Sequence, residues 1–198
     1  MTGSPAIPAA PAIPPDPLDT VTTPRLVLRA WEPTDLDRLT EIWAQREVWE
    51  FPLHRGLTAE ETARWLERQL ARQQEPVEPM LRAACDRSTG TLLGFIGLSV
   101  PTFLPEILPA VEVGWRLEPH WWGRGLATEG ARAMVAYGFD QLGLGRIWSI
   151  YEPENAPSGR VMDKLGMHLE RETTHPELGV PLRVLVIDRP AAGDHTRT

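Results

Sequence analysis

Apolar residues recur along the chain with two periods, and these periods predict strands and helices in alternation. Short apolar runs containing β-branched residues predict strands at residues 25–30, 81–86, 92–100, 111–117, 146–151, 167–171 and 182–187. Apolar residues three and four positions apart predict helices from residue 34 onward, at 58–72, within 123–142 and at 156–165. This order of elements, without an internal repeat, indicates a single α/β (α+β) domain.

Polar residues at the ends of these segments support their bounds. Thr34 with Asp37, and Thr58 with Glu61, have the spacing of a capping box, which satisfies two backbone N–H groups at the start of a helix. Residues 87–90, Arg-Ser-Thr-Gly, have turn chemistry and predict a hairpin between the strands on either side. Two helices and then a hairpin are therefore expected after the first strand.

The two ends of the chain differ from the rest. Residues 1–19 contain six prolines and neither lysine nor arginine. Proline lacks the backbone N–H that helices and sheets use, so this composition is typical of an extended tail. We expect a disordered tail over residues 1–21, a folded domain over residues 22–190 and a flexible tail over residues 191–198. A ligand for a proline-binding module is the alternative to a plain spacer for the first tail.

Composition and charge narrow the class of protein. A chain of 198 residues that is 42% apolar supplies one ordinary core, and its 20 basic against 27 acidic residues leave no overall positive field for nucleic acid or anionic lipid. The single cysteine, Cys85, and five dispersed histidines offer no metal-ligand spacing. No apolar run approaches the ~20 residues that span a bilayer, and the start lacks the regions of a signal peptide. A soluble, cytoplasmic and metal-free protein is expected.

Residues 111–129 carry the clearest chemical pattern. A strand ends at Pro119, a loop with Gly123 and Gly125 follows, and a helix begins. Several backbone N–H groups then point into one space at the positive end of a helix dipole, and the glycines let that backbone approach a phosphate closely. Neither the Gly-Lys-Ser/Thr of a P-loop nor the glycine spacing of a Rossmann loop is present. The pattern predicts a diphosphate site of another kind.

These residues resemble a known family. Residues 122–129, Trp-Gly-Arg-Gly-Leu-Ala-Thr-Glu, resemble the acyl-CoA pyrophosphate loop of the GNAT acetyltransferases, whose pattern is Arg/Gln-x-x-Gly-x-Gly/Ala. Tryptophan replaces the leading Arg or Gln, as is usual in the branch of ribosomal-protein N-terminal (RimJ/RimL-like) acetyltransferases. The resemblance extends from residues 23–29, Thr-Pro-Arg-Leu-Val-Leu-Arg, to residues 155–167, Asn-Ala-Pro-Ser-Gly-Arg-Val-Met-Asp-Lys-Leu-Gly-Met. Only the two termini lie outside it.

The resemblance implies a mixed, mostly antiparallel central sheet flanked by helices, with strands 111–117 and 147–151 splayed apart at the acyl-CoA site. The pantetheine arm of acetyl-CoA would lie in the opening and bond to backbone groups near Trp115 and Leu117, as an added strand does. The loop would hold the pyrophosphate through Trp122, Gly123, Arg124, Gly125, Leu126, Ala127 and Thr128. Arg124 would add charge at the nucleotide end, and a solvated loop cation is its alternative interpretation.

Transfer of an acyl group to an amine needs a neutral amine and a proton for the departing thiolate. The resemblance gives the first role to Glu112, which would deprotonate the amine through water; the alternative is a glutamate that binds substrate ammonium or pairs with an arginine. The tyrosine of the family's last helix is replaced by Met162, which has no proton to give. Ser158 is the substitute that the branch indicates, and Tyr151 is the second candidate, against plain capping and packing roles. Asn155 is an N-cap that in the family also bonds near the pantetheine.

Aromatic residues are the remaining candidates. Core packing explains those at helical or strand core positions, Trp43, Trp65 and Trp148. The family's substrate wall forms around the first two helices, and there the resemblance places Trp31, Trp49 and Phe51 beside an acceptor pocket. Cys85 has no histidine near it in sequence, and we interpret it as a small buried residue.

The sequence thus predicts an acyl-CoA-dependent N-acyltransferase that transfers acetyl directly from acetyl-CoA to a primary amine, on a protein N-terminus or a small molecule. The rival is a non-catalytic acyl-CoA-binding or interaction module on the same fold, which the missing tyrosine favours. The acceptor is not specified, and a homodimer is left open, as is a succinyl donor if an arginine such as Arg55 or Arg82 faces the thioester. Neither nucleic acid nor a membrane is an expected partner.

Overall fold

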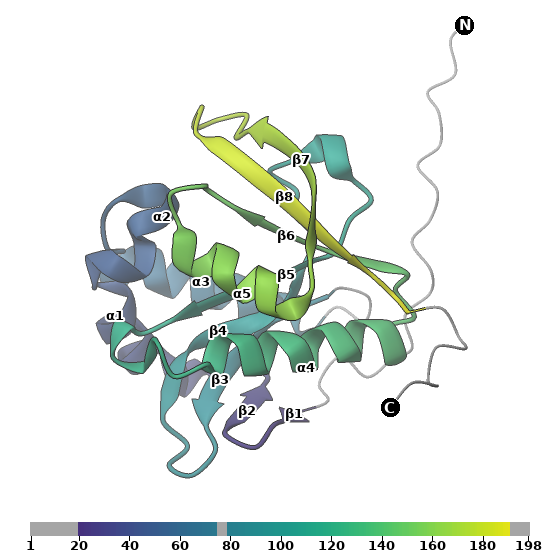
Figure 1. Ribbon diagram of the computed structural model, residues 1–198. Helices are drawn as coiled ribbons and strands as arrows, with labels where there is room; N and C mark the ends of the chain where they lie inside the picture. Colours follow the sequence, from purple (N-terminus) through teal and green to yellow (C-terminus); the bar gives the residue numbers. More distant parts are fainter. Residues whose placement is uncertain (1–19, 75–78, 191–198) are drawn as a thin grey trace, which may run out of the picture.

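One mixed sheet runs through the part of the chain that the structure, a computed structural model, describes: residues 20–74 and 79–190 (Figure 1). Its eight strands lie in the order β1-β2-β3-β4-β5-β6-β8-β7. Neighbouring strands are antiparallel except for β5 and β6, which are parallel. This confirms the expected mostly antiparallel α/β domain.

The bounds of the elements follow the hydrophobic pattern closely. The strands are β1 (Val21–Thr22), β2 (Leu26–Arg29), β3 (Leu81–Asp86), β4 (Leu92–Ser99), β5 (Glu112–Leu117), β6 (Arg146–Tyr151), β7 (His168–Thr174) and β8 (Pro181–Asp188). The helices are α1 (Leu36–Trp43), α2 (Glu50–Leu53), α3 (Ala59–Arg72), α4 (Leu126–Asp140) and α5 (Ala156–Leu165). Four 3-10 turns accompany them, η1 (Pro33–Asp35), η2 (Arg46–Trp49), η3 (Pro105–Ile107) and η4 (Pro119–Trp121). β3, β6 and α5 have the predicted bounds.

Helices cover both faces of the sheet. Side chains alternate along β4, so Ile96 packs in the core under α4 while Phe95 packs with Trp43 of α1 on the opposite face. α4 and α5 lie in front of the sheet in Figure 1, and α1 and α3 belong to the other layer. Within residues 20–74 and 79–190, no helix is long and apolar enough to cross a bilayer.

The start of the first helix differs from the prediction. Helix α1 begins at Leu36 after η1, and the caps expected from Thr34 and Asp37 are wrong. Asp35 instead accepts a hydrogen bond from the backbone N–H of Glu32 (2.8 Å) and two from Arg29 (2.7 and 2.9 Å). The hydrogen bond from Arg29 to Asp35 raises the pKa of that guanidinium. A buried carboxylate therefore takes the place of a hydroxyl cap, because it also neutralises an arginine from β2.

The second predicted cap is confirmed. The backbone N–H of Glu61 donates to the hydroxyl of Thr58 (3.2 Å), and the backbone N–H of Thr58 donates to the carboxylate of Glu61 (2.8 Å). Helix α3 accordingly begins at Ala59.

The domain begins slightly earlier than expected. Val21 of β1 pairs with Leu28 of β2, so residue 21 is part of the sheet and not of the tail. The remainder of the predicted tails, residues 1–19 and 191–198, lies outside the described residues.

A gap between β5 and β6 positions the site, and we call it the β5–β6 gap. The two strands are paired at Glu112 and Trp148, where the N–H of Trp148 donates to the carbonyl of Val111 (2.9 Å). One step further, the hydroxyl of Ser149 donates to the carbonyl of Val113 (2.9 Å). From there on no register pair joins the two strands in the part of the chain that the structure describes. The splay that the sequence predicted between these strands is thus present.

Candidate active site

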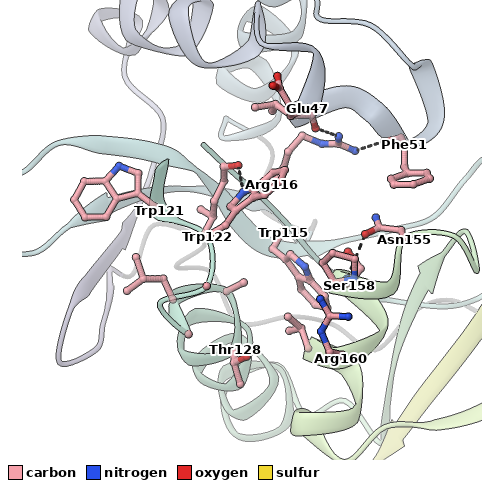
Figure 2. A pocket seen from close by; sticks show the side chains of 18 of the residues that line it. Glu47, Phe51, Trp115, Arg116, Trp121, Trp122, Thr128, Asn155, Ser158 and Arg160 are labelled. Carbon is pink, nitrogen blue, oxygen red and sulfur yellow. Dashed lines mark hydrogen bonds between the residues drawn. The ribbon is translucent and has the colours of Figure 1, made fainter. Parts of the chain in front are cut away.

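A cavity of about 480 Å³ lies along the end of β5, beside the β5–β6 gap (Figure 2). Its wall comes from the end of β5, the loop after η4, the first turn of α4, one face of α5, and residues 47–51. Most of the predicted cofactor residues line it, namely Trp115, Leu117, Trp122, Gly123, Gly125, Leu126, Ala127, Thr128, Asn155 and Ser158. The structure therefore brings together residues that lie more than forty positions apart in the sequence.

The loop before α4, residues 122–125, presents backbone donors to this cavity. Gly125 is the N-cap of α4 with a φ of +78°, and no side chain caps the helix. Since the first N–H groups of a helix have no partner within it, those of Leu126, Ala127 and Thr128 remain available. A Cβ added at Gly125 meets only the Arg25 side chain, at 3.6 Å, so the positive φ is the reason for glycine there. This geometry suits an anionic group at the positive end of the helix dipole.

An ion pair holds this loop against the sheet. The Arg25 guanidinium donates to the Glu129 carboxylate (2.7 Å) and to the backbone carbonyl of Arg124 (2.8 Å). Thr23 donates its hydroxyl to the same carboxylate (2.7 Å). Burial raises the pKa of Glu129, but the hydrogen bonds from Thr23 and Arg25 outweigh it and the pKa is lowered. The loop and the first turn of α4 are thus fixed by residues from the start of the domain.

The edge of β5 offers further backbone groups. The bonds at Val111 and Val113 show that odd-numbered residues direct their backbone N–H and C=O groups toward β6. The same alternation directs those of Trp115 into the β5–β6 gap. At Leu117 the carbonyl already accepts a hydrogen bond from the Trp122 indole (2.7 Å). Trp122, in the place of the family's leading Arg or Gln, therefore ties the loop to the end of β5.

The first turn of α5 forms the opposite wall. Asn155 caps the helix by accepting a hydrogen bond from the backbone N–H of Ser158 (3.3 Å), as predicted, and both residues line the cavity. Within the described residues the Ser158 hydroxyl makes no hydrogen bond. Arg160 and Lys164, four positions apart on α5, line the same cavity. Figure 2 shows Arg160 beside Trp115 and Ser158.

Comparison with known proteins decides the family. The model of the GNAT acetyltransferase domain matches residues 25–168, which is most of the chain. This chain belongs to the GNAT acetyltransferase family. The uncharacterized N-acetyltransferase YnaD of Bacillus subtilis (strain 168) is 29% identical over 150 residues, covering 76% of this chain and 83% of YnaD. Together, the family and its named relatives identify the chain as an N-acetyltransferase.

Solved structures show the same fold. A GNAT-family acetyltransferase from Bacillus anthracis superposes with a TM-score of 0.71 at 24% identity, covering 86% of this chain and 98% of its own. The ribosomal alpha-N-protein acetyltransferase RimL, solved in complex with coenzyme A, superposes with a TM-score of 0.70 at 14% identity, with the same coverage of 86% and 98%. At these identities the likeness concerns the GNAT fold alone.

Glu112 lies in β5 but outside the cavity lining of this GNAT domain. Its carboxylate accepts a hydrogen bond from the Ser99 hydroxyl (3.0 Å) on the neighbouring strand. Desolvation raises its pKa to about 7, although the hydrogen bond from Ser99 lowers it. The β4–β5 register is continuous from Ser99 to Gly94, without a bulge, so Glu112 and Arg116 lie on one face of the sheet and Trp115 on the other.

Tyr151 is placed away from the cavity lining. Its ring packs against α5, where a Cβ added at Gly159 would lie 3.0 Å from a ring carbon. Its interaction with Arg183 of β8 raises the pKa of that guanidinium. Among the three catalytic candidates, only Ser158 lines the cavity.

The aromatic candidates have three different environments. Phe51 lines the cavity. Trp49 lies one layer behind it, with the Arg116 guanidinium 3.9 Å from its ring centroid. Trp31 is buried, packs edge-on against Trp65 and donates its indole N–H to the Leu81 carbonyl (2.9 Å). The structure therefore places Phe51 at the cavity wall and Trp31 in the core.

The cysteine and the arginines that the sequence analysis named lie outside the cavity lining. Burial raises the pKa of the Cys85 thiol, which packs in the core. Arg55 pairs with Glu61 (2.6 Å), and Arg82 stacks over the Tyr137 ring. Neither arginine lines the cavity. Arg124 also lies outside it, over the Trp121 ring at 4.9 Å.

Sequence reasoning missed a basic residue that does line the cavity. Arg116 donates to the backbone carbonyls of Val48 and Phe51 (3.1 Å for Phe51), and desolvation lowers its pKa to about 10. The sequence did not predict that Arg116 contacts residues 48 and 51, because residues 46–53 have no helical apolar period that indicates where they pack. Arg160 and Lys164 were detectable, since a basic pair four residues apart lies on one face of a helix.

Proposed function

We propose that this N-acetyltransferase transfers acetyl directly from acetyl-CoA to a primary amine, on a small molecule or at a protein N-terminus. One observation carries the proposal: a single cavity joins the uncapped N-terminus of α4, the unpaired edge of β5 and the hydroxyl of Ser158. Acyl-CoA has a diphosphate, an amide-containing arm and a thioester in the same order.

The residues at the nucleotide end fit a diphosphate. The N–H groups of Leu126, Ala127 and Thr128 supply donors at the uncapped start of α4. Arg160 and Lys164 add positive charge from the facing helix. Because a diphosphate is dianionic or more at neutral pH, donors and cations on two sides of one cavity favour it over an uncharged ligand.

The residues along β5 fit the amide-containing arm. The backbone N–H and C=O of Trp115 face the β5–β6 gap and would bond to amides as a neighbouring strand does. Asn155, across the gap, caps α5 and holds Ser158 at the cavity wall. When bound, acetyl-CoA supplies the thioester carbonyl that the amine attacks.

Glu112 is the proposed base. A general base works best when its pKa lies near the working pH, and the pKa of about 7 meets this condition. Since the carboxyl is outside the cavity lining, it would receive the ammonium proton through water and not by direct contact. Its alternative role, an ionic partner of an arginine, has no support among the described residues, where its hydrogen-bond partner is Ser99.

Ser158 is the proposed donor to the departing thiolate. Its hydroxyl lies at the cavity wall without a partner among residues 20–74 and 79–190, so it is free to donate to developing charge on sulfur. Met162, which replaces the family's tyrosine, is 1% exposed and packs in the core. Tyr151 lies outside the cavity lining and stays the second candidate.

A screen of acyl-CoA donors against amines, read by release of free thiol and by mass spectrometry of the product, tests the proposal. We expect acetyl-CoA to give thiol release that depends on the amine. A non-catalytic acyl-CoA-binding module would instead show thermal stabilisation by CoA and no product with any donor or amine. Stabilisation by CoA is expected in both cases, so product formation separates them.

A further inference from the structure

The Arg116 guanidinium lies at the cavity wall, and the proposed reaction gives it no role. It extends from β5 toward residues 47–51, as Figure 2 shows, and lines the cavity there. Its terminal nitrogens donate to the carbonyls of Val48 and Phe51, and its face lies 3.9 Å from the Trp49 ring centroid. These contacts fix the planar group without neutralising it.

No carboxylate among the described residues is paired with Arg116. Glu50, on the same wall, is instead paired with Arg46 (2.9 Å) and His54 (3.4 Å). A guanidinium has five N–H donors, and Arg116 uses two of them on carbonyls, while its Nε has no partner. A desolvated cation with spare donors at a cavity wall is unfavourable unless an anion binds there.

The position of Arg116 decides which substrate brings that anion. Trp115 directs its backbone into the β5–β6 gap and its side chain toward the α4 and α5 layer, where the cofactor residues lie. Arg116 points to the opposite face, where Phe51 forms the wall assigned to the acceptor. The anion therefore belongs with the acceptor and not with the nucleotide of the donor.

We infer that the amine acceptor carries a carboxylate that binds Arg116, as in a free amino acid or a related amino-carboxylate. The inference rests on the proposed acetyl transfer and names its acceptor class. A carboxylate accepts charge-assisted hydrogen bonds from the remaining N–H groups of a guanidinium that is already oriented. An acceptor with cationic groups alone, such as a polyamine, would leave the guanidinium without an anion.

Isothermal titration in the presence of CoA tests this on the unmodified protein. L-amino acids are titrated in matched pairs, each as the free acid and as its carboxamide, which removes the charge and keeps the shape. We expect at least one acid to bind ten times more tightly than its amide. Equal binding of acid and amide across the panel, or no binding of any acid, would overturn the inference.

Variants assign the effect to the residue. Arg116→Gln should abolish the preference for the acid, and Arg116→Lys should retain part of it, because lysine keeps the charge but not the planar fork. Arg55→Gln is the matched control, since Arg55 pairs with Glu61 outside the cavity and should leave the preference unchanged. A folded Arg116→Gln protein that still prefers the acid contradicts the inference, whereas the wild-type comparison stands even if that variant does not fold.

Thiol release separates this inference from the proposed function. If amines without a carboxylate are acetylated and no amino acid is preferred, acetyl transfer stands and the acceptor class is wrong. If acids bind through Arg116 but no amine yields thiol from acetyl-CoA, the carboxylate site stands and the proposed transfer fails.

Discussion

The Arg25 guanidinium lies 2.6 Å from the Glu129 carboxylate, although 104 residues separate them in the chain. The two residues belong to two of the three sequence segments that carry the family resemblance, 23–29 and 122–129. Their contact gives a physical reason for the co-occurrence of these segments: the first holds the loop of the second. Because Arg25 also donates to the carbonyl of Arg124, it orients the peptide that precedes Gly125.

Breaking this contact should weaken CoA binding more than it weakens the fold. Arg25 is half exposed, so the ion pair contributes little to global stability. Glu129→Gln should lower CoA affinity several-fold, because the loop donors lose their fixed position. A double-mutant cycle with Arg25→Met, measured by titration with CoA, should show strong non-additivity. Additive losses would mean that the two side chains act on the loop separately.

Gly125→Val should raise the dissociation constant for acetyl-CoA tenfold or more, which is about 1.4 kcal/mol. A β-branched residue cannot adopt the φ of +78° without strain, so the loop and its N–H groups must move. Gly143→Val is the control, because Gly143 has a φ of +66° in the turn after α4 and lies outside the cavity lining. Gly143→Val should lower thermal stability and leave the dissociation constant for acetyl-CoA unchanged. An equal effect of the two variants on binding would contradict a diphosphate site at the loop before α4.

Turnover should depend on the ionisation of Glu112. A base acts in its charged form, so kcat/KM should rise with pH through an apparent pKa of about 7 and level off above it. Glu112→Gln should lower turnover about a hundredfold, with acetyl-CoA binding retained. Ser99→Ala removes the hydrogen bond that lowers the pKa, so it should shift the rise to higher pH. If Glu112→Gln keeps nearly full turnover at every pH, the carboxylate is not the base, and positioning of an already neutral amine must dominate.

Ser158→Ala should reduce turnover more mildly than Glu112→Gln, because water can occupy the place of the hydroxyl but is less well oriented. The effect should appear in kcat and not in the dissociation constant for CoA, since Asn155 still caps α5. Met162→Leu, four positions along the same helix, conserves volume in the core and should leave turnover nearly unchanged. Steady-state kinetics with acetyl-CoA and an accepted amine measures both.

The fold was largely predictable because the hydrophobic periods match the buried positions. α5 is the clearest case, since Asn155 marks its start and Gly166 its end, and the structure places both at these caps. The start of α1 was not predictable from the capping pattern, because the contact between Asp35 and Arg29 depends on tertiary structure and not on local spacing. A local capping pattern therefore predicts the first residue of a helix only when no tertiary ion pair such as that of Asp35 with Arg29 competes with it.

The site was predictable where it consists of backbone and motif residues, and not where it depends on packing. Gly123 and Gly125 could be placed because their spacing has a direct geometric meaning. Trp31 and Phe51 could not be distinguished, since only the fold shows that one packs against Trp65 and the other faces the cavity. Arg116 was overlooked for the same reason. An arginine in a strand is expected to be exposed to solvent, and only the fold shows that residues 47–51 cover it.

The short pairing of β5 with β6 also divides the sheet mechanically. Strands β1 to β5 form one continuous ladder, and β6, β8 and β7 form another, joined along the sheet by the single register pair of Glu112 and Trp148. Because so little pairing joins them, the two ladders should differ in amide-exchange protection, although a shared core packs against both. A molecule that bonds to both sides of the β5–β6 gap would couple the two ladders, so occupancy should slow exchange in β8 as well as in β5. The donor would then act as an added strand that joins the two ladders of the sheet where they lack pairing of their own.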